Sequence, residues 1–322
     1  MQVSQAIASS ALQKVVLSSS PVKIMEPLRR MRGGCQSHFM RGEDDAYYIV
    51  KSPQNPQGSR TLVNELLYSL VALDLQLPVA KPAIVWVGQK LIDYSADLYF
   101  ENPVAPNTKW RESLCYGSEV PVNPHQATCI DFLPPAVLEY LGNLASFAGA
   151  LVLDEWFANG DPRQAVFFRQ TPYFAYQAVF IDHGLCFGGN EWNFYAKPAS
   201  SLFWPTCVYG TIQTLEDFEP WLSKVESLTI DRLRSYVPLI PPEWFSHDFE
   251  KLDRLLNQLV ARSVDLRFLI ASLCANTPKA FPSWRSGHEF RPRANRVAFG
   301  RRVPNRNSRS SDLKHGLSQK GD

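Results

Sequence analysis

Two strand-like segments in the middle of the chain each lie next to an aspartate, and this pairing strongly constrains the fold. A helical pattern over residues 144–157 leads into the loop Asn159-Gly160-Asp161-Pro162-Arg163-Gln164, and residues 165–169 then read as a strand. After a Thr-Pro turn, a second apolar strand over residues 178–181 ends at Asp182-His183-Gly184. Strands separated by a turn are typical of a hairpin. We therefore expect Asp182 to face the loop that carries Asp161.

These polar residues have the chemistry that phosphoryl transfer needs. A carboxylate at Asp161 can accept or orient the proton of an attacking hydroxyl group, and the amide of Gln164 can help to hold a metal ion. A carboxylate at the strand end, Asp182, can anchor a Mg²⁺ ion that bridges two phosphates. Each pattern alone also fits an ordinary turn, because Asn-Gly-Asp-Pro is a strong turn sequence.

A lysine and a glutamate upstream add a second pair. Residues 47–51 read as a strand that ends at Lys51, and Glu65 lies on a helix expected over residues 61–73, where leucines recur at steps of four, four and three. A strand lysine held by a helix carboxylate neutralises and positions nucleotide phosphates. The alternative is a solvated lysine at a strand end and a surface glutamate. A further strand is expected over residues 83–87.

Paired glycines precede the lysine strand. Gly33 and Gly34, followed by Cys35, Gln36 and Ser37, lie between a basic stretch and an apolar strand. Glycines allow backbone N–H groups to approach phosphates closely. An isolated Gly-Gly pair is also common in ordinary turns.

Composition limits the other classes of protein. The chain has 322 residues, of which 45% are hydrophobic and 20% charged, and its six cysteines form no Cys-x-x-Cys pair. These values are typical of a globular protein and suggest neither a zinc site nor a disulfide framework. No apolar run approaches the ~20 residues of a membrane span, and no secretory signal begins the chain. We expect a soluble, cytoplasmic protein.

Charge and pattern also divide the chain. Residues 1–26 read as a flexible leader, residues 92–128 as a loop-rich insertion, and residues 215–273 as a bundle of helices. From Thr277 onward, 11 Lys and Arg residues face 3 Asp and Glu residues, which leaves 22 against 28 before it. We expect this basic tail, residues 277–322, to be disordered.

Several motifs together resemble the HipA-like kinase family, in its compact bacterial form. The resemblance spans about three quarters of the chain, from Gly33 to about Ile270, and is carried by short motifs: residues 33–38, 50–51, 62–67, 130–134, 161–167, 181–184 with 186–187, 191–194 and 241–244. It implies an α+β, bilobal protein-kinase-like fold with a small α/β N-lobe over residues 27–133 and a mainly helical C-lobe over residues 134–276.

The resemblance also implies a function. It implies a serine/threonine kinase that transfers the γ-phosphoryl group of ATP to a protein hydroxyl, with Asp161 as the catalytic aspartate and Asp182 as a Mg²⁺ ligand. Lys51 and Glu65 then bind ATP together with Gly33, Gly34, Gln36, Ser37 and Asp131. The resemblance does not identify the protein substrate, and it leaves open whether an antitoxin-like partner exists.

One departure from the kinase pattern leaves alternatives open. Kinases carry an asparagine five residues after the catalytic aspartate, but here that position is Val166, so Gln164 or Asn159 would have to replace it. The alternative function is a nucleotide-binding pseudokinase that acts as a regulatory module. A third and weaker hypothesis is that the basic tail contacts nucleic acid. The segment 191–194 fits a packing anchor better than a site.

Overall fold

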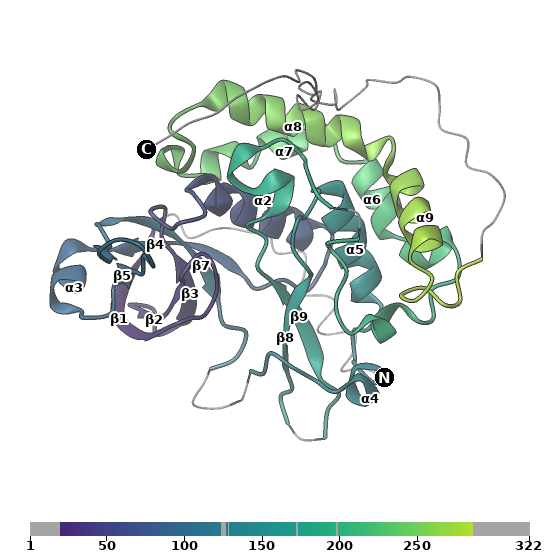
Figure 1. Ribbon diagram of the computed structural model, residues 1–322, viewed down its shortest axis with the longest axis horizontal. Helices are drawn as coiled ribbons and strands as arrows, with labels where there is room; N and C mark the ends of the chain where they lie inside the picture. Colours follow the sequence, from purple (N-terminus) through teal and green to yellow (C-terminus); the bar gives the residue numbers. More distant parts are fainter. Residues whose placement is uncertain (1–19, 124–126, 128, 172, 198, 286–322) are drawn as a thin grey trace, which may run out of the picture. The chain divides into compact units, whose positions relative to one another are not determined.

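The computed structural model describes residues 20–123, 127, 129–171, 173–197 and 199–285. By its contact pattern the chain divides into residues 1–289 and residues 290–322, so every described residue belongs to the first unit. This unit contains a closed β-barrel and a larger, mainly helical part (Figure 1). The mixed content confirms the expected α+β class.

The barrel is built from strands in the order β1-β2-β3-β7-β4. Their bounds are Val22–Arg30 for β1, His38–Gly42 for β2, Tyr47–Lys51 for β3, Pro82–Val87 for β4 and Ser113–Glu119 for β7. Only the β1–β4 contact is parallel, and it closes the barrel. Inward-facing residues such as Ile24, Met40 and Val50 fill the interior, as strand alternation requires.

Two features of the barrel differ from expectation. The leader was expected to reach residue 26, but β1 already begins at Val22. Residues 92–128 were expected to be a loop-rich insertion, but they contain β7, which pairs with both β3 and β4. The sequence of β7 hides the strand because Gly117 and two serines interrupt any apolar alternation. Gly117 is needed there, since an added Cβ would lie 2.7 Å from Val85.

Helix α2, Arg60–Asp74, lies between the barrel and the helical part. It was expected to be amphipathic, but every residue from Thr61 to Ala72 is buried. Barrel strand β7 packs on one side, where Tyr116 and Ser69 are joined by a hydrogen bond of 3.1 Å. The loop after β9 packs on the other side. The helix therefore fixes the barrel to the rest of the unit.

The helical part also contains a small hairpin. Strands β8, Gln164–Phe168, and β9, Gln177–Ile181, pair in register, with Gln164 opposite Ile181, which confirms the expected hairpin. The main helices of this part are α5, Ser146–Trp156, α6, Trp221–Glu226, α7, Ile230–Arg234, α8, Phe249–Ser263, and α9, Leu266–Asn276. Further short elements are α3, Gln89–Tyr94, β5, Tyr99–Phe100, β6, Thr108–Lys109, and α4, Pro135–Leu138, together with 3-10 helices η1, Cys186–Glu191, η2, Thr206–Tyr209, η3, Leu215–Phe218, η4, Val237–Leu239, and η5, Pro242–Phe245. Among the described helices, none is long and apolar enough to cross a membrane.

The beginning of the predicted basic tail is part of the core. Ala280 and Phe281 are buried and belong to the main apolar cluster, and Trp284 packs against it. The backbone N–H of Arg285 donates to Gln213 O at 2.8 Å. The boundary at Thr277 was therefore placed about nine residues too early, because only a few apolar residues anchor this segment. The remainder of the predicted tail lies outside the described residues.

Candidate active site

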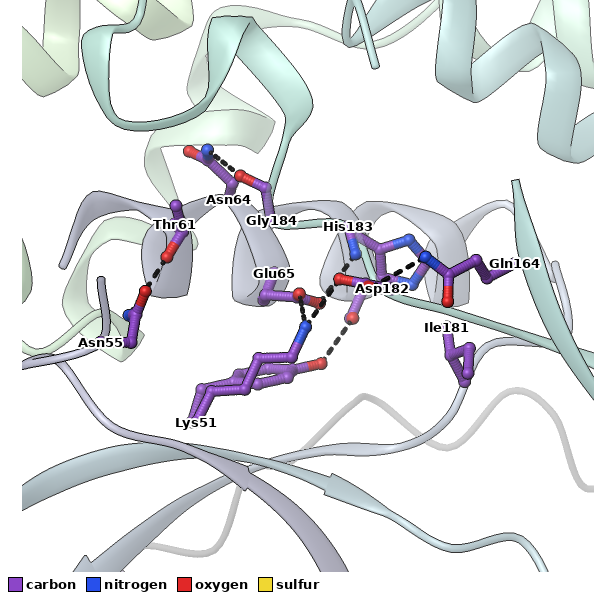
Figure 2. Close-up of polar contacts among 12 residues, drawn as sticks. Lys51, Asn55, Thr61, Asn64, Glu65, Gln164, Ile181, Asp182, His183 and Gly184 are labelled. Atoms are coloured by element: carbon purple, nitrogen blue, oxygen red, sulfur yellow. Dashed lines mark hydrogen bonds and ion pairs between the residues drawn. The ribbon is translucent and has the colours of Figure 1, made fainter. Parts of the chain in front are cut away.

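Lys51, Glu65 and Asp182 meet between the barrel, helix α2 and the end of β9 (Figure 2). Lys51 Nζ donates to Glu65 Oε1 and, at 2.8 Å, to Asp182 Oδ1. The lysine side chain and the glutamate are both buried, whereas the Asp182 side chain is partly exposed. Three of the residues singled out in the sequence, Lys51, Glu65 and Asp182, therefore form one contiguous group.

Lys51 and Asp182 each stabilise the charged form of the other. Burial acts against the charge of Lys51, but the carboxylates of Asp182 and Glu65 outweigh it and raise the lysine pKa well above its usual value. In return the lysine lowers the pKa of Asp182. Both groups are thus charged at neutral pH, which is the state that binding of phosphate and of a metal ion requires.

Asp182 is held in a backbone conformation that non-glycine residues rarely adopt. Its φ is 62°, in the left-handed region. Its backbone is fixed from one side by Arg163, whose Nη2 donates to the carbonyl oxygens of Ile181 and Asp182, both at 2.6 Å. On the other side Glu65 Oε2 accepts the N–H of His183 at 3.0 Å. This conformation sends the Asp182 carboxylate toward Lys51.

Gln164, one of the two amides considered in place of the missing asparagine, lies beside Asp182. It is the first residue of β8, and its Nε2 donates to Asp182 Oδ2 at 3.0 Å. Both carboxylate oxygens of Asp182 are therefore engaged, one by Lys51 and one by Gln164. The Gln164 side chain is exposed, so its contact can be exchanged for another ligand of Asp182 without loss of core packing.

Asp161 occupies the loop between α5 and β8. Among the described residues, none donates a hydrogen bond to its carboxylate. Burial, and then the nearby charge of Asp182, raise its pKa above the usual aspartate value. A carboxylate with a raised pKa and no partner is suited to accept a proton.

Asn159, the other amide considered for metal binding, is buried and structural. Its Nδ2 donates to Asp154 Oδ1 at 3.1 Å, and its Oδ1 accepts the backbone N–H of Asp161 at 3.2 Å. Both ends of the amide are thus used to shape the loop. Of the two amides, only Gln164 reaches Asp182.

Arg163 and Asp154 are site residues that the sequence analysis did not single out. They form a buried ion pair of 2.8 Å. The same Nη1 atom of Arg163 also donates to His183 Nδ1 at 3.0 Å, so this imidazole nitrogen carries no proton. Consistent with that, burial lowers the pKa of His183 well below its usual value. Asp154 and its neighbour Glu155 are the only charged residues of the apolar helix α5, and an acid in such a helix was the signal that could have revealed this pair.

Asn64 holds the loop that follows Asp182. Its Nδ2 contacts the carbonyl oxygens of Gly184, Cys186 and Gly189 at 2.8 to 3.0 Å. Its Oδ1 accepts the indole N–H of Trp192 at 2.8 Å. The segment 191–194 thus packs through Trp192 on helix α2, in agreement with the packing role expected for it.

The glycine loop connects β1 and β2. Gly33 has a φ of 127°, and a Cβ added there would meet no atom within 4 Å, so the residue is required by its backbone conformation and borders open space. Gln36 faces away from Lys51: its Oε1 accepts the N–H of Glu101 at 2.7 Å and its Nε2 donates to Glu101 O at 3.0 Å. Gly34 lies against Gln57, and Ser37 is buried. Gln36 therefore anchors the loop.

Asp131 is separate from the group around Lys51. It is exposed and lines an open pocket of about 350 Å³ beside the loop of Asp161, which includes Pro162, Arg163 and Gln164. Within the described chain, no cluster of three or more His, Cys, Asp or Glu side chains is arranged to hold a metal ion.

Comparison with known proteins supports the family resemblance over part of the chain. Residues 24–103 match the family model described as HipA-like kinase, which confirms the resemblance over this stretch. The matched residues include the glycine loop, Lys51 and Glu65, but neither Asp161 nor Asp182. No curated protein matches the chain.

Solved kinase structures are similar at low identity. The Golgi casein kinase with Mn/ADP bound is 11% identical, with a TM-score of 0.43, and the match covers 81% of this chain and 76% of that chain. The kinase CtkA, a proinflammatory kinase of Helicobacter pylori, is 13% identical, with a TM-score of 0.39, and the match covers 76% of this chain and 97% of the other.

Proposed function

We propose that this protein is an ATP-dependent phosphotransferase of the HipA-like kinase type, which transfers the γ-phosphoryl group of Mg-ATP to a serine or threonine hydroxyl of a protein. The barrel with α2 acts as the N-lobe and the helical part as the C-lobe. The observation that carries the proposal is the contact of Lys51 with both Glu65 and Asp182, next to an unpartnered Asp161.

The residues present fit a nucleotide and a magnesium ion. Lys51 would contact phosphate oxygens while Glu65 keeps it in place, and the open space beside Gly33 admits phosphates close to backbone N–H groups. Mg²⁺ prefers oxygen ligands and usually retains several waters. Asp182 would supply the carboxylate ligand, with Gln164 as the neighbouring amide, and the metal would neutralise charge on the phosphates.

Asp161 would orient the attacking hydroxyl group and accept its proton. Its pKa is raised by burial and by the charge of Asp182, which outweigh the opposing charges of Arg163 and Lys51. Arg163 and Asn159 would position the loop that presents it.

A nucleotide-binding pseudokinase is the second candidate. One observation favours it: Lys51 and Gln164 each bind one carboxylate oxygen of Asp182. Both oxygens of the carboxylate that would hold the metal are therefore already hydrogen-bonded to protein groups. Both candidates bind ATP, but only the first transfers phosphate.

The deciding experiment measures two properties of the same variants. With γ-labelled ATP and Mg²⁺, the parent should transfer label to protein serine or threonine, while Asp161→Asn should lose transfer and still bind Mg-ATP by calorimetry. Asp217→Asn, a change at a described aspartate that caps a short helix away from this site, serves as the matched control and should transfer label normally. Parent protein that binds Mg-ATP without any transfer would support the pseudokinase instead.

A further inference from the structure

Most of the residues that line the pocket beside the Asp161 loop lie outside the group around Lys51, while Gln164, which contacts the Asp182 carboxylate, and Arg163, which contacts its backbone, belong to both. Its lining comprises Asp131, Phe132, Leu133, Pro162, Arg163, Gln164, Ala165, Phe167, Ile181, Phe203, Trp204 and Pro205. None of these belongs to a barrel strand, and neither Lys51, Glu65 nor Asp182 is among them. The pocket therefore begins at the catalytic loop and lies on the helical part alone.

The two faces of β8 explain this separation. Ala165 and Phe167 line the pocket and are buried, whereas Val166, which points to the opposite face, does not line it. The backbone of Ile130 pairs with Phe167, which brings Asp131 and Phe132 along the edge of β8. The pocket is thus a feature of the hairpin edge beside the loop of Asp161, and it borders the Lys51–Asp182 group at Gln164.

Its chemistry is that of a site for a cationic side chain. Leu133, Phe167 and Phe203 are buried in its lining, whereas Phe132 and Trp204 are 65% and 62% exposed. Asp131 adds an exposed carboxylate that forms no ion pair with any described lysine or arginine. An aromatic face next to a carboxylate attracts a guanidinium or ammonium group through cation–π and ionic contacts.

The volume and the charge balance agree with that ligand. A pocket of about 350 Å³ is at the small end of the range for ligand sites and holds one long side chain. The whole chain has a net charge of +2, but residues 1–276, which include the pocket, carry 28 acidic and 22 basic residues, so the acidic excess lies in the part of the sequence that forms the pocket.

We propose that this pocket binds an arginine or lysine side chain of the protein substrate, a few residues from the hydroxyl that is phosphorylated. The inference rests on the proposed kinase function. It assigns Asp131 to substrate recognition, in place of the nucleotide contact implied by the family resemblance. Trp204 and Phe132 would hold the aliphatic and charged parts of the side chain, and Asp131 would pair with its charge.

The first test uses synthetic peptides and γ-labelled ATP. A set of serine peptides carries one arginine at each position in turn, and a second set carries citrulline, which has nearly the same shape without the charge. We expect the parent to prefer arginine at one position by about tenfold in kcat/KM. Asp131→Asn should reduce that preference to less than about threefold and leave the rate on arginine-free peptides unchanged.

Asp231→Asn is the matched control, since it removes the same charge from an exposed aspartate on α7 that does not line the pocket. It should keep the full preference. A parent without preference for a basic residue at any position, or an Asp131→Asn variant that keeps it, would overturn the inference.

A binding experiment separates this inference from the proposed function. The chain has eight tryptophans, and after labelling with 5-fluorotryptophan the ¹⁹F resonance of Trp204 is identified by its loss in Trp204→Phe. We expect the arginine peptide, but not the citrulline peptide, to shift this resonance, and Asp131→Asn to weaken the effect. If the parent transfers no phosphate at all, the kinase proposal fails, and a Trp204 resonance that the arginine peptide leaves unmoved would overturn the pocket assignment independently.

Discussion

Lys51 Nζ lies 2.8 Å from Asp182 Oδ1, although the two residues are 131 positions apart in the chain. The contact joins the last residue of a barrel strand to the end of the β8–β9 hairpin. Since Glu65 on α2 holds the same lysine, three separate elements converge on one ammonium group. A change at Lys51 therefore affects both ligand binding and the contact between these elements.

We expect Lys51→Met to abolish the rise in melting temperature that ATP causes, because the variant lacks the charge that would contact phosphate. The variant should also melt at a lower temperature without ligand, since removing one partner of a buried ion pair costs about 3–5 kcal/mol. Thermal denaturation with and without Mg-ATP measures both effects.

Lys81→Met is the control for this comparison. Lys81 is 71% exposed and pairs with Glu119 at 3.1 Å. Its loss should lower the free energy of unfolding by no more than about 1 kcal/mol and should leave the response to ATP unchanged. A Lys51→Met variant with the full ATP response would contradict the assigned role.

Asp182 and Gln164 have different proposed roles in metal binding, so substitutions at the two positions should have different effects. Asp182→Ala removes the carboxylate and should eliminate the tightening of ATP binding by Mg²⁺. Gln164→Ala removes only an exposed amide contact, so one metal should still bind and transfer should fall by no more than about tenfold, the scale of one hydrogen bond. Calorimetry with ATP in the presence and absence of Mg²⁺ checks this, and equal Mg²⁺ dependence in Asp182→Ala and the parent would refute it.

The pH dependence of transfer should report Asp161. The pKa of this carboxylate is raised by burial and by the charge of Asp182, and only its ionised form can accept a proton. As the pH falls, activity should therefore be lost at a higher pH than an ordinary aspartate would give.

The pH at which this loss occurs, the acidic limb of the pH–rate profile, should depend on the metal. A Mg²⁺ ion on Asp182 offsets the carboxylate charge, so the limb should move to lower pH as the Mg²⁺ concentration rises. Single-turnover rates at low and saturating Mg²⁺ measure it. The assignment fails if the limb moves to higher pH, or if Asp161→Asn retains the same limb in residual transfer.

The positions of several candidate site residues were predictable, because Lys51 and Asp182 follow apolar strands, Asp161 lies in the loop after an apolar helix, and Glu65 lies within the next helix after Lys51. Such positions can be recognised from the local pattern alone. Their supports could not be recognised in this way. Asn64 lies on a helix that is buried on all sides, and a 3.6-residue period describes only a helix with one buried face.

The same limit applies to β7 and to Gln36. A strand with Gly117 and two serines shows no alternation, so only its neighbours β3 and β4 identify it. Gln36 follows the paired glycines and looks suited to phosphate, but its partner Glu101 is 65 residues away. Contacts over such separations depend on tertiary packing, which a local pattern does not contain.

Arg163 should act as a positioning residue for Asp182. Its planar guanidinium group contacts Ile181 O, Asp182 O and Asp154 together, and the single ammonium group of a lysine does not reproduce that geometry. We expect Arg163→Lys to weaken the Mg²⁺ effect on ATP binding by about tenfold or more, since each hydrogen bond of a charged donor contributes about 1.5–3 kcal/mol.

The control for Arg163 is Arg262→Lys. Arg262 also donates two hydrogen bonds to a backbone carbonyl, Glu155 O, at 2.9 and 3.1 Å, but not near Asp182. This variant should lose some stability and keep the Mg²⁺ effect. If both variants lose stability equally and neither alters the Mg²⁺ effect, Arg163 has only a structural role.

The final prediction concerns the point at which the chain can be shortened. Phe281 is 2% exposed and contacts Tyr209 with a ring distance of 5.1 Å, and Arg285 N donates to Gln213 O. A chain that ends at Asn276 loses these contacts, and Phe281→Ala in the full chain should cost about 3–5 kcal/mol. A chain that ends at Arg285 keeps them. We therefore expect the longer chain to retain Mg-ATP binding and to melt at a clearly higher temperature than the shorter chain. The basic composition of residues 277–322 alone would not predict this difference. Equal melting temperatures for the two truncated chains, or no destabilisation by Phe281→Ala, would show that this segment contributes nothing to the core.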